Sequence, residues 1–441
     1  MILRLSLKVI RRLWKLLMQC FALFLLVLAA IPFCLAARRI GRQHRSRPRL
    51  VWGDAPIISN PYWARIMRDA GYPSISLTDS YCSAINSRAD YDLLLDEEFR
   101  FLPEVLRRVA RFLMALLRYD IFFISFNGFV LAKCSFWRLE AHLLKLAGKK
   151  VVVMPFGLDA YVYQRIRSSE LMHGLMMSIP GPARMQKKIG RRVDYWCQLA
   201  DAVIPGIMWL DGFGRWDAFV PSVIHVNEDD WPISTRLSLA DGVSKPVRIA
   251  HAPNHRGFKG SEFVIEAVRQ LQAEGVQVEL LLIEGKPNSE VKRILYEEAD
   301  ILVEQLICPG HGLNALEGMA SGLPVVCNLE NDDYLRPLRR WSYFGQCPLV
   351  SAEPENLIEV LRQLISEPEL RHHLGRAGRD YIEKYQGKSA AQFFYMKVID
   401  YVCGNGGHLI HLFHPLTSAR MKELGPIDHP LKNSKLPKSE K

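Results

Sequence analysis

Short apolar runs alternate with longer amphipathic stretches between residues 49 and 402, and this alternation predicts two successive halves built of strands and helices. In the first half, strands are expected at 50–53, 74–77, 120–126, 150–154 and 200–205. In the second half, they are expected at 247–253, 278–283, 301–303, 323–326 and 347–351. Unbroken apolar runs are typical of strands that are buried on both faces, as in parallel sheets. The pattern therefore predicts an α/β chain with two parallel sheets.

One helical stretch of the first half is unusually rich in arginine. Leucine, valine and phenylalanine recur at helical spacing between residues 97 and 118, which predicts an amphipathic helix. Arg107, Arg108 and Arg111 are expected on its solvent-facing side. In a membrane-bound protein these arginines could also contact anionic lipid.

The N-terminus contains an uncharged apolar stretch at 16–37 that is long enough to span a bilayer. It exceeds the roughly 7–15 apolar residues of a signal peptide, which favours a retained anchor over a cleaved signal. Arginines follow it densely at 38–49, and this favours a cytoplasmic position for the rest of the chain. Pro32 also permits a kinked or surface-lying helix. We therefore expect an anchor at the cell membrane.

The net charge of +11 belongs entirely to this N-terminus. Residues 1–50 contain eleven Lys and Arg and no acidic residue, and the remaining 46 basic residues equal the 46 Asp and Glu. This distribution indicates a membrane surface as partner and argues against nucleic acid, because no basic and aromatic module follows. The nine cysteines form no Cys-x-x-Cys pair, so we expect a reducing compartment.

A loop rich in glycine is the first candidate site. The sequence CPGHG at 308–312 follows the strand at 301–303, and a helix of small residues opens near Gly312. A loop that leads from the carboxyl end of a strand into a helix exposes backbone N–H groups, which suit a phosphate. Glu317 lies about one turn further, where its carboxylate could accept hydrogen bonds from a ribose diol. The alternative is an ordinary βαβ turn with an exposed glutamate.

Two cations lie in the loop that follows the strand at 247–253. Arg256 and Lys259 come just before Gly260 and the helix that it opens. Fixed cations at such a position suit phosphate recognition, and they would stabilise the charge that develops on a departing nucleoside diphosphate. We therefore expect Arg256 and Lys259 to act at the same site as the loop at 308–312.

The sequence GLNALEGMASGLPVV at 312–326 resembles the donor-binding motif of retaining, nucleotide-sugar-dependent glycosyltransferases with the GT-B fold. Glu317 matches the second glutamate of that motif, which holds the nucleotide ribose, whereas Pro309 stands where the family has its first glutamate. Lys259 and Gly260 match the Lys-Gly of the family's donor loop. The resemblance implies a donor site made of Lys259, Gly260, Gly310, His311, Gly312, Leu313 and Glu317.

A second resemblance lies in the first half. The sequence PFGLDAY at 155–161 follows an expected strand and is similar to the His-Gly-x-Asp segment of the same family. Gly157 and Asp159 match this segment, whereas Phe156 replaces the histidine. The resemblance implies that Asp159 positions an acceptor hydroxyl; the alternative is that its side chain caps the following helix. Arg256, Lys259 and Asp159 are therefore the candidate catalytic residues.

The resemblance implies two Rossmann-like domains that face each other across a cleft, with the hydrophobic segment at the N-terminus. In chain order we expect a membrane anchor at 1–48, an acceptor domain at 49–225, a linker at 226–246, a nucleotide-sugar domain at 247–386, a crossover helix at 387–402 and a flexible tail at 403–441.

The expected activity is transfer of a sugar from a nucleotide diphosphate sugar to a lipid-linked or polysaccharide acceptor, with retention of configuration. We expect no metal site and no cofactor, with the nucleotide sugar as substrate. Two alternatives stay open. One is a non-catalytic scaffold of this fold, which Pro309 and Phe156 would suit. The other is a nucleotide-sugar epimerase, against which the basic anchor argues.

Overall fold

The computed structural model describes residues 2–42, 46–81, 87–233 and 238–438. Two compact units share the chain: Met1–Asp159, Arg191–Val203 and Val398–Gly406 form the first, and Ala160–Gly190, Ile204–Lys397 and Gly407–Lys441 form the second. The residues at 160–190 and 204–225, which we expected in the first domain, therefore belong to the second unit. Residues 43–45 of the expected anchor and 234–237 of the expected linker lie outside the described residues.

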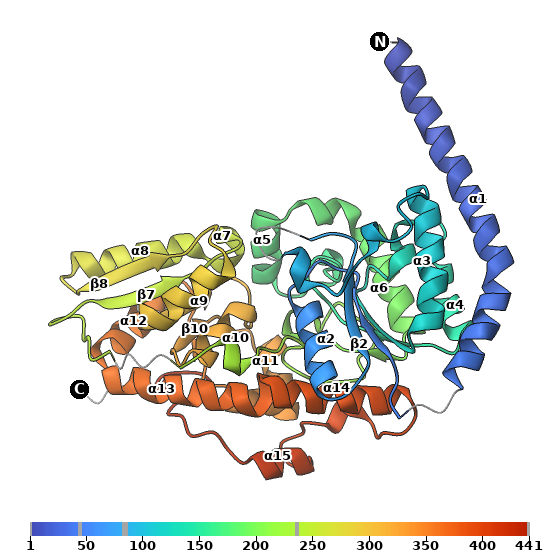
Figure 1. Ribbon diagram of the computed structural model, residues 1–441. Coiled ribbons are helices and arrows are strands. Elements are labelled where there is room, and N and C mark those ends of the chain that lie inside the picture. Colours follow the sequence, from blue (N-terminus) through green and yellow to red (C-terminus); the bar gives the residue numbers. More distant parts are fainter. Residues whose placement is uncertain (1, 43–45, 82–86, 234–237, 439–441) are drawn as a thin grey trace. The chain divides into compact units, whose positions relative to one another are not determined.

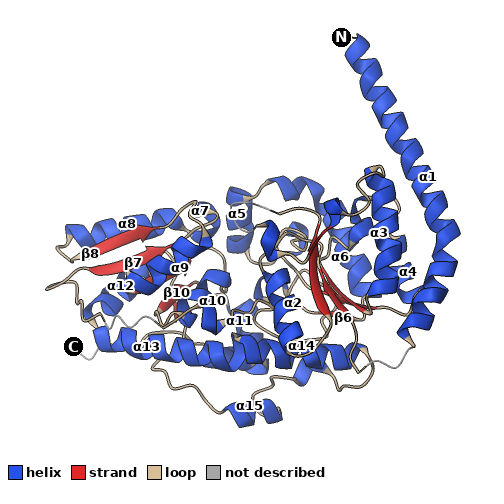
Figure 2. Ribbon diagram, in the orientation of Figure 1, coloured by secondary structure: helices blue, strands red, loops and turns tan. Residues whose placement is uncertain are grey.

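The first unit is built on a six-stranded parallel sheet (Figure 2). Its strands are β1 (Leu50–Trp52), β2 (Ser74–Thr78), β3 (Leu93–Leu94), β4 (Ile121–Ile124), β5 (Lys150–Val153) and β6 (Ala202–Val203). Their order is β3-β2-β1-β4-β5-β6, and every neighbouring pair is parallel. This doubly wound order reverses direction between β1 and β4, whose carboxyl ends form the edge where such sheets bind ligands.

Helices α2 (Ser59–Asp69), α3 (Glu104–Arg118), α4 (Leu139–Leu146) and α6 (Gln186–Leu199) accompany this sheet. α3 begins at Glu104 and not at residue 97, because Pro103 restricts the backbone of the residue before it to extended conformations.

The expected exposure of the α3 arginines is wrong for two of the three. Arg108 is buried, and its Nη2 donates to Asp79 Oδ2 at 2.8 Å. Arg111 is also buried, and its Nη2 donates to Glu98 O at 2.7 Å. Both partners lie on other segments of the first unit. Helical spacing within α3 therefore could not indicate that these charges would be enclosed.

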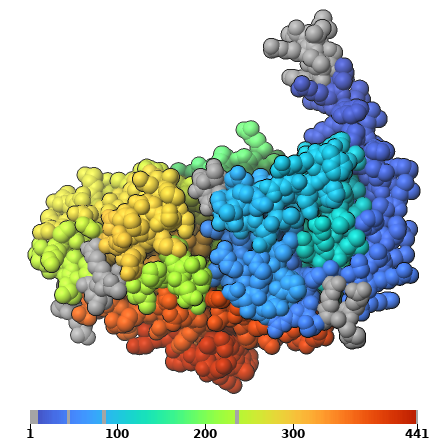
Figure 3. Space-filling model, in the orientation of Figure 1, coloured from blue at the N-terminus to red at the C-terminus, as the bar shows by residue number. Residues whose placement is uncertain are grey.

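α1 (Ile2–Gly41) is one continuous helix that lies beside α3 and α4 (Figures 1 and 3). Its segment Val9–Gly41 is long and apolar enough to cross a membrane. One stripe of this segment is nevertheless buried in the protein; it consists of Ala22, Leu26, Ala30, Cys34 and Ala37. Small side chains at four of these positions allow the helix backbones to approach closely. The apolar stretch is therefore docked on the first unit along one face.

Polar contacts fix this docking. The backbone N–H of Ser135 donates to Gln19 Oε1 at 3.0 Å, and the Cys34 thiol lies 3.6 Å from Leu143 O at the end of α4. Gln19 and Cys34 are 15 positions apart in α1, so α1 and the first unit are joined along a length of helix and not at one point.

The second unit has a five-stranded parallel sheet. Its strands are β7 (Val247–His251), β8 (Val278–Leu282), β9 (Ile301–Gln305), β10 (Val325–Cys327) and β11 (Val350–Ser351). Their order is β11-β10-β9-β7-β8, and all neighbours are parallel. Counted in chain order this is the 2-1-3-4-5 arrangement of doubly wound sheets, with its switch point between β7 and β9.

Nine α-helices lie wholly within the second unit among the described residues. They are α5 (Ser169–Ser178), α7 (Arg256–Lys259), α8 (Ser261–Ala273), α9 (Asn288–Glu297), α10 (Leu313–Ala320), α11 (Asp332–Trp341), α12 (Leu357–Ser366), α13 (Pro368–Tyr381) and α15 (Ala419–Leu424). α14 (Lys388–Val402), expected as a crossover helix, contributes residues up to 397 to the second unit and its later residues to the first.

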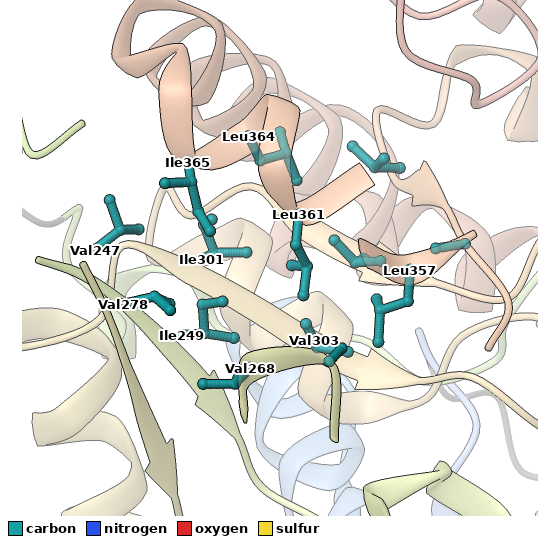
Figure 4. Packing of buried hydrophobic residues seen from close by; sticks show 14 of the residues in the cluster. Val247, Ile249, Val268, Val278, Ile301, Val303, Leu357, Leu361, Leu364 and Ile365 are labelled. Atoms are coloured by element: carbon teal, nitrogen blue, oxygen red, sulfur yellow. The ribbon is translucent and has the colours of Figure 1, made fainter. Parts of the chain in front are cut away.

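The hydrophobic core of the second unit lies between the sheet and the helices α8 and α12 (Figure 4). The strands supply fully buried valine and isoleucine side chains at 247, 249, 301 and 303. α12 supplies Leu357, Leu361 and Leu364, which recur every three or four residues and therefore point to one side of the helix. This core holds β7 and β9 side by side, and so fixes the loops that leave their carboxyl ends.

The C-terminal segment, expected as a flexible tail at 403–441, is attached to the second unit at several points of its described part. Leu431 is buried in the core of the second unit. The backbone N–H of Ser351 donates to Ser434 O at 2.7 Å, and Gln363 Nε2 donates to Pro437 O at 3.0 Å. The Lys, Pro and Ser content of this segment suggested disorder, but a few apolar residues suffice to attach it.

We predict that Leu361→Ala lowers the free energy of unfolding by about 2–5 kcal/mol, because it leaves a cavity in the core between the sheet and α12. Leu416→Ala is the matched control, since Leu416 is 78% exposed. Chemical denaturation of the full chain, followed by circular dichroism, measures both. Equal unfolding midpoints for the two variants would contradict this description of the core.

Candidate functional site

The loops after β7 and β9 meet at the switch point of the second sheet. β7 pairs with β9 in parallel, so their carboxyl ends lie at the same edge. The loop after β7 leads into α7, whose last residue is Lys259, and β9 ends with Glu304 and Gln305. Three polar side chains that are far apart in the sequence are thereby brought to one edge of the sheet.

Lys259 and Glu304 form a buried ion pair at this edge. The Lys259 ammonium donates to Glu304 Oε1 and, at 2.8 Å, to Gln305 Oε1. The Lys259 side chain is 11% exposed and that of Glu304 is 1% exposed. An ammonium has three N–H donors, so one remains beyond these two hydrogen bonds. Buried charges of this kind persist only with partners, and each member therefore fixes the other.

Gly312 brings the N-terminus of α10 against this pair. Its backbone N–H donates to Glu304 Oε2 at 3.2 Å. A Cβ at this position would lie 2.9 Å from Glu304 Oε1 and 3.4 Å from Lys259 Nζ, so a larger residue would displace the Glu304 carboxylate. The Glu304 carboxylate is thus bound by an ammonium on one side and by a helix N-terminus on the other. These are the two kinds of group that bind phosphate oxygens.

The loop between Glu304 and Gly312 is held by Gln305. Its Nε2 donates to Cys308 O at 3.0 Å and to Gly310 O at 2.9 Å. Gly310 has a φ of +94°, in the left-handed region that favours glycine. The side-chain amide of Gln305 therefore determines the path that leads the chain into α10.

His311, within this loop, is almost fully buried. Neither ring nitrogen has a hydrogen-bond partner in the described residues, and the backbone of Gly312 provides an electrostatic contact without hydrogen-bond geometry. Burial lowers the pKa of His311, so its ring is neutral at physiological pH. A neutral imidazole can donate one hydrogen bond and accept another.

Glu317 lies one turn into α10 and is also buried. Its carboxylate accepts hydrogen bonds from Asn314 Nδ2 at 3.1 Å and from Asn288 Nδ2 at 3.4 Å. Burial raises the pKa of Glu317, although both amides favour its ionised form. Lys259 lies beside Gly312 at the start of α10, the half-buried Leu313 follows it, and Glu317 lies one turn further along the same helix.

Arg256 is not part of this group. It is the first residue of α7, and its guanidinium is bound by Glu284 through Nε at 2.7 Å and Nη2 at 2.7 Å. Its Nη1 donates to Glu262 at 2.9 Å. Gly260 separates α7 from α8 in a left-handed conformation, with a φ of +72°. Arg256 is therefore held at an exposed surface by two carboxylates, whereas Lys259 points into the protein.

Asp159 belongs to the first unit, at the carboxyl edge of its sheet. Its carboxylate accepts hydrogen bonds from the backbone N–H groups of Phe126 and Phe156, each at 3.0 Å. Burial raises the pKa of Asp159 to about 6, against the effect of these hydrogen bonds. The side chain thus joins the loops after β4 and β5. It holds these two loops together, whereas the alternative expectation was that it would cap the following helix.

The sequence assigned no role to Glu304, Gln305 or Asp54. Glu304 and Gln305 look like ordinary strand residues, and only their pairing with Lys259 shows their role. Asp54 follows β1 at the switch point of the first sheet; burial, with the nearby charges of Asp79 and Glu140, raises its pKa to about 8. Its position directly after a buried strand was the available signal. Among the described residues, no group of three His, Cys, Asp or Glu could hold a metal ion.

No known protein-family profile matches the chain, and no curated protein matches it in sequence. Among solved structures, the chain is similar to sucrose-phosphate synthase from Thermosynechococcus elongatus, with a TM-score of 0.50 and 12% identity over 81% of this chain and 99% of that one. HepE from Anabaena, in complex with UDP and glucose, has a TM-score of 0.49 and 11% identity over 80% of this chain and 100% of that one.

A candidate UDP-N-acetylglucosamine 2-epimerase from Listeria monocytogenes has a TM-score of 0.43 and 12% identity over 82% of this chain and 98% of that one. At such identities a likeness shows the fold alone. The predicted fold class is confirmed: the chain has two parallel-sheet α/β units like those of GT-B glycosyltransferases, and an apolar N-terminal helix.

Proposed function

We propose that the chain is a glycosyltransferase that moves a sugar from a nucleotide diphosphate sugar to an acceptor. The observation that carries this proposal is the group at the switch point of the second sheet. There an ammonium, the N-terminus of an eight-residue helix and a buried carboxylate follow one another along about one helical turn. The ammonium and the helix N-terminus suit the diphosphate of a nucleotide, and the carboxylate suits its ribose.

In this proposal the donor diphosphate binds to the remaining N–H of Lys259 and to the free backbone N–H groups at the start of α10. His311 adds a neutral hydrogen-bonding group within the same loop. The ribose hydroxyls donate to Glu317, whose position is fixed by Asn314 and Asn288. Glu304 supplies the negative charge that keeps Lys259 buried and in place when no donor is bound.

In the reaction, a bond forms between the acceptor oxygen and the anomeric carbon, and the bond from that carbon to the phosphate oxygen breaks. The proton of the acceptor hydroxyl passes to an oxygen of the departing diphosphate. Lys259 and the N-terminus of α10 stabilise the charge on the leaving group, which lowers the barrier by electrostatic preorganisation. This scheme uses no protein-bound metal, and we propose that configuration is retained.

The acceptor is proposed to be a lipid-linked sugar or polysaccharide at the cytoplasmic face of the cell membrane. The support is the apolar helix α1 and the run of arginines that follows it. Asp159 would then contribute as a brace that positions the loops of the first unit, with no contact to the reacting atoms.

An epimerase is the second candidate, because an epimerase needs groups that exchange protons near neutral pH. Asp54 and Asp159 lie at the carboxyl edge of the first sheet, and burial raises their pKa values to about 8 and about 6. An epimerase would convert the nucleotide sugar without any acceptor, and a transferase would not. Incubation of the protein with nucleotide sugars alone, followed by chromatography of the sugars, separates the two functions.

We predict that Lys259→Ala and Glu317→Ala each weaken nucleoside diphosphate binding by about tenfold or more, because each removes a hydrogen bond to or from a charged group. Arg256→Ala is the control and should change the affinity by less than about threefold, since its charge is already satisfied at the surface. Calorimetry of the full chain with a panel of nucleoside diphosphates measures these affinities.

Loss of Lys259 alone leaves Glu304 buried and uncompensated, which destabilises the unit. The double variant Lys259→Ala, Glu304→Gln removes both charges and should fold while still failing to bind. No binding of any nucleotide by the unmodified protein would leave the scaffold as the better account. Equal losses for Arg256→Ala and Lys259→Ala would refute the assignment of the site.

The raised pKa of Glu317 makes a pH dependence of binding predictable. The ionised carboxylate accepts the ribose hydrogen bonds, so affinity is present above the pKa and is lost as the pH falls through it. Because burial raises this pKa above the ordinary value of 4.5, the loss begins at a higher pH than for an exposed glutamate. Measurements of nucleotide affinity between about pH 5 and about pH 8 test this. The variant Glu317→Gln, which has no carboxylate to titrate at this position, is the control. An identical pH profile for that variant would contradict the role of Glu317.

A further inference from the structure

A cavity at the end of α1 carries an excess of positive charge. It has a volume of about 530 Å³ and lies where α1 ends, beside the amino ends of β4 and β5. Among the described residues that line it, the cations are Arg38, Arg42, Arg47, Lys149 and Lys150, and Asp120 is the one acidic residue. This is the edge of the first sheet opposite to that of Asp54 and Asp159. The cavity is therefore separate from any site at the carboxyl edge.

The single acid of this cavity is already neutralised. Asp120 is bound by Arg49 Nη2 at 2.9 Å and by Lys149 Nζ at 3.2 Å. Burial alone would raise the pKa of Asp120, but the hydrogen bonds from Arg49 and the charge of Lys149 lower it to about 2. Asp120 therefore stays ionised at physiological pH, and its negative charge is balanced by Arg49 and Lys149. It does not offset the arginines of α1.

The arginines are the groups left to bind an anion. Arg38 and Arg42 are one helical turn apart and exposed, and neither forms an ion pair within the described part of the chain. The Arg47 guanidinium lies 4.7 Å from the centre of the Tyr72 ring, and its Nη1 is buried without a hydrogen-bond acceptor. Guanidinium groups of this kind bind phosphate oxygens with two parallel hydrogen bonds.

The exposed face of α1 indicates where the anion comes from. Its inner face is buried on α3 and α4 along the apolar stretch, so lipid cannot surround the helix on all sides (Figure 1). Its outer face consists of large apolar side chains that are about half exposed or more: Phe21, Phe24, Val27, Leu28, Ile31 and Leu35. A helix with one protein-facing side and one apolar side fits a position along the membrane surface. The cavity at its end would then lie at the level of the lipid headgroups.

We propose that this cavity binds the phosphate of an anionic lipid headgroup, with Arg38 and Arg42 as its principal ligands and Arg47 as a third. The apolar face of α1 would enter the outer part of the membrane leaflet that contains this lipid. One edge of the first unit would then contact both the charged headgroup and the apolar part of the leaflet. This inference rests on the membrane association in the proposed function, and it adds a defined site with a preferred ligand.

The test compares two double variants that lose equal charge. Arg38→Gln with Arg42→Gln removes the ligands in the cavity, and Arg11→Gln with Arg12→Gln removes exposed charges from α1 outside it. Partition of the full chain is measured on vesicles of phosphatidylcholine alone and with about one third phosphatidylglycerol. General attraction to a charged surface acts on both pairs alike. We expect the first variant to lose about tenfold more of the phosphatidylglycerol-dependent binding than the second.

Each outcome decides the proposal. Equal losses in the two double variants would overturn the site in favour of general electrostatics, as would no loss in either. Binding of inorganic phosphate by the cavity without any preference for phosphatidylglycerol vesicles would overturn the lipid and assign a soluble anion. If the unmodified protein binds no vesicles at all, the membrane part of the proposed function fails with it, and nucleotide binding remains as a separate test.

Cys403 provides a second readout, since it lines the cavity and is exposed. Phosphatidylglycerol vesicles should slow its alkylation by a maleimide in the unmodified protein, as measured by mass spectrometry of its peptide. In the variant Arg38→Gln, Arg42→Gln this protection should disappear while the fold, judged by circular dichroism, is unchanged. Protection that persists in the variant would show that α1 alone covers the cavity, and would overturn the site.

Discussion

The buried ion pair of Lys259 and Glu304 is the interaction on which the candidate site depends. It joins the helix after β7 to the end of β9 across the switch point of the sheet, and Gly312 adds the start of α10 to the same carboxylate. Removal of one charge would leave the other uncompensated, at a cost of about 3–5 kcal/mol. Such a pair adds little net stability by itself. Its effect is to fix the relative positions of three segments that would otherwise be separate loops.

The elements of this arrangement that could be predicted from the sequence are those with a local signature. Apolar runs located the strands, because strands buried on both faces exclude polar residues over several positions. The glycine at 312 and the small residues that follow it indicated a loop entering a helix, and Lys259 with Gly260 indicated a second one. Each of these signals depends on residues within a single turn or strand, where sequence spacing and spatial spacing agree.

The elements that the sequence did not reveal depend on pairing over long distances along the chain. Glu304 lies 45 positions from Lys259, so nothing near either residue indicated the ion pair. Arg256 was grouped with Lys259 because they are close in sequence, yet Glu284 and Glu262 bind it at the surface. Arg108 was assigned to solvent because the helical spacing of the apolar residues left it on the opposite face, although Asp79 binds its guanidinium inside the protein. In each case the partner comes from another element, and only the assembled fold determines which charges are buried.

Hydrogen exchange of the backbone amides at residues 310–315, with and without a saturating nucleoside diphosphate, tests the central claim most directly. The free amides at the start of α10 are the groups that would receive the diphosphate, and no substitution is needed to observe them. The account predicts that exchange slows at Gly312 and in the first turn of α10 when nucleotide is bound. Bound nucleotide with unchanged exchange across this segment, and protection elsewhere in the chain, would contradict it.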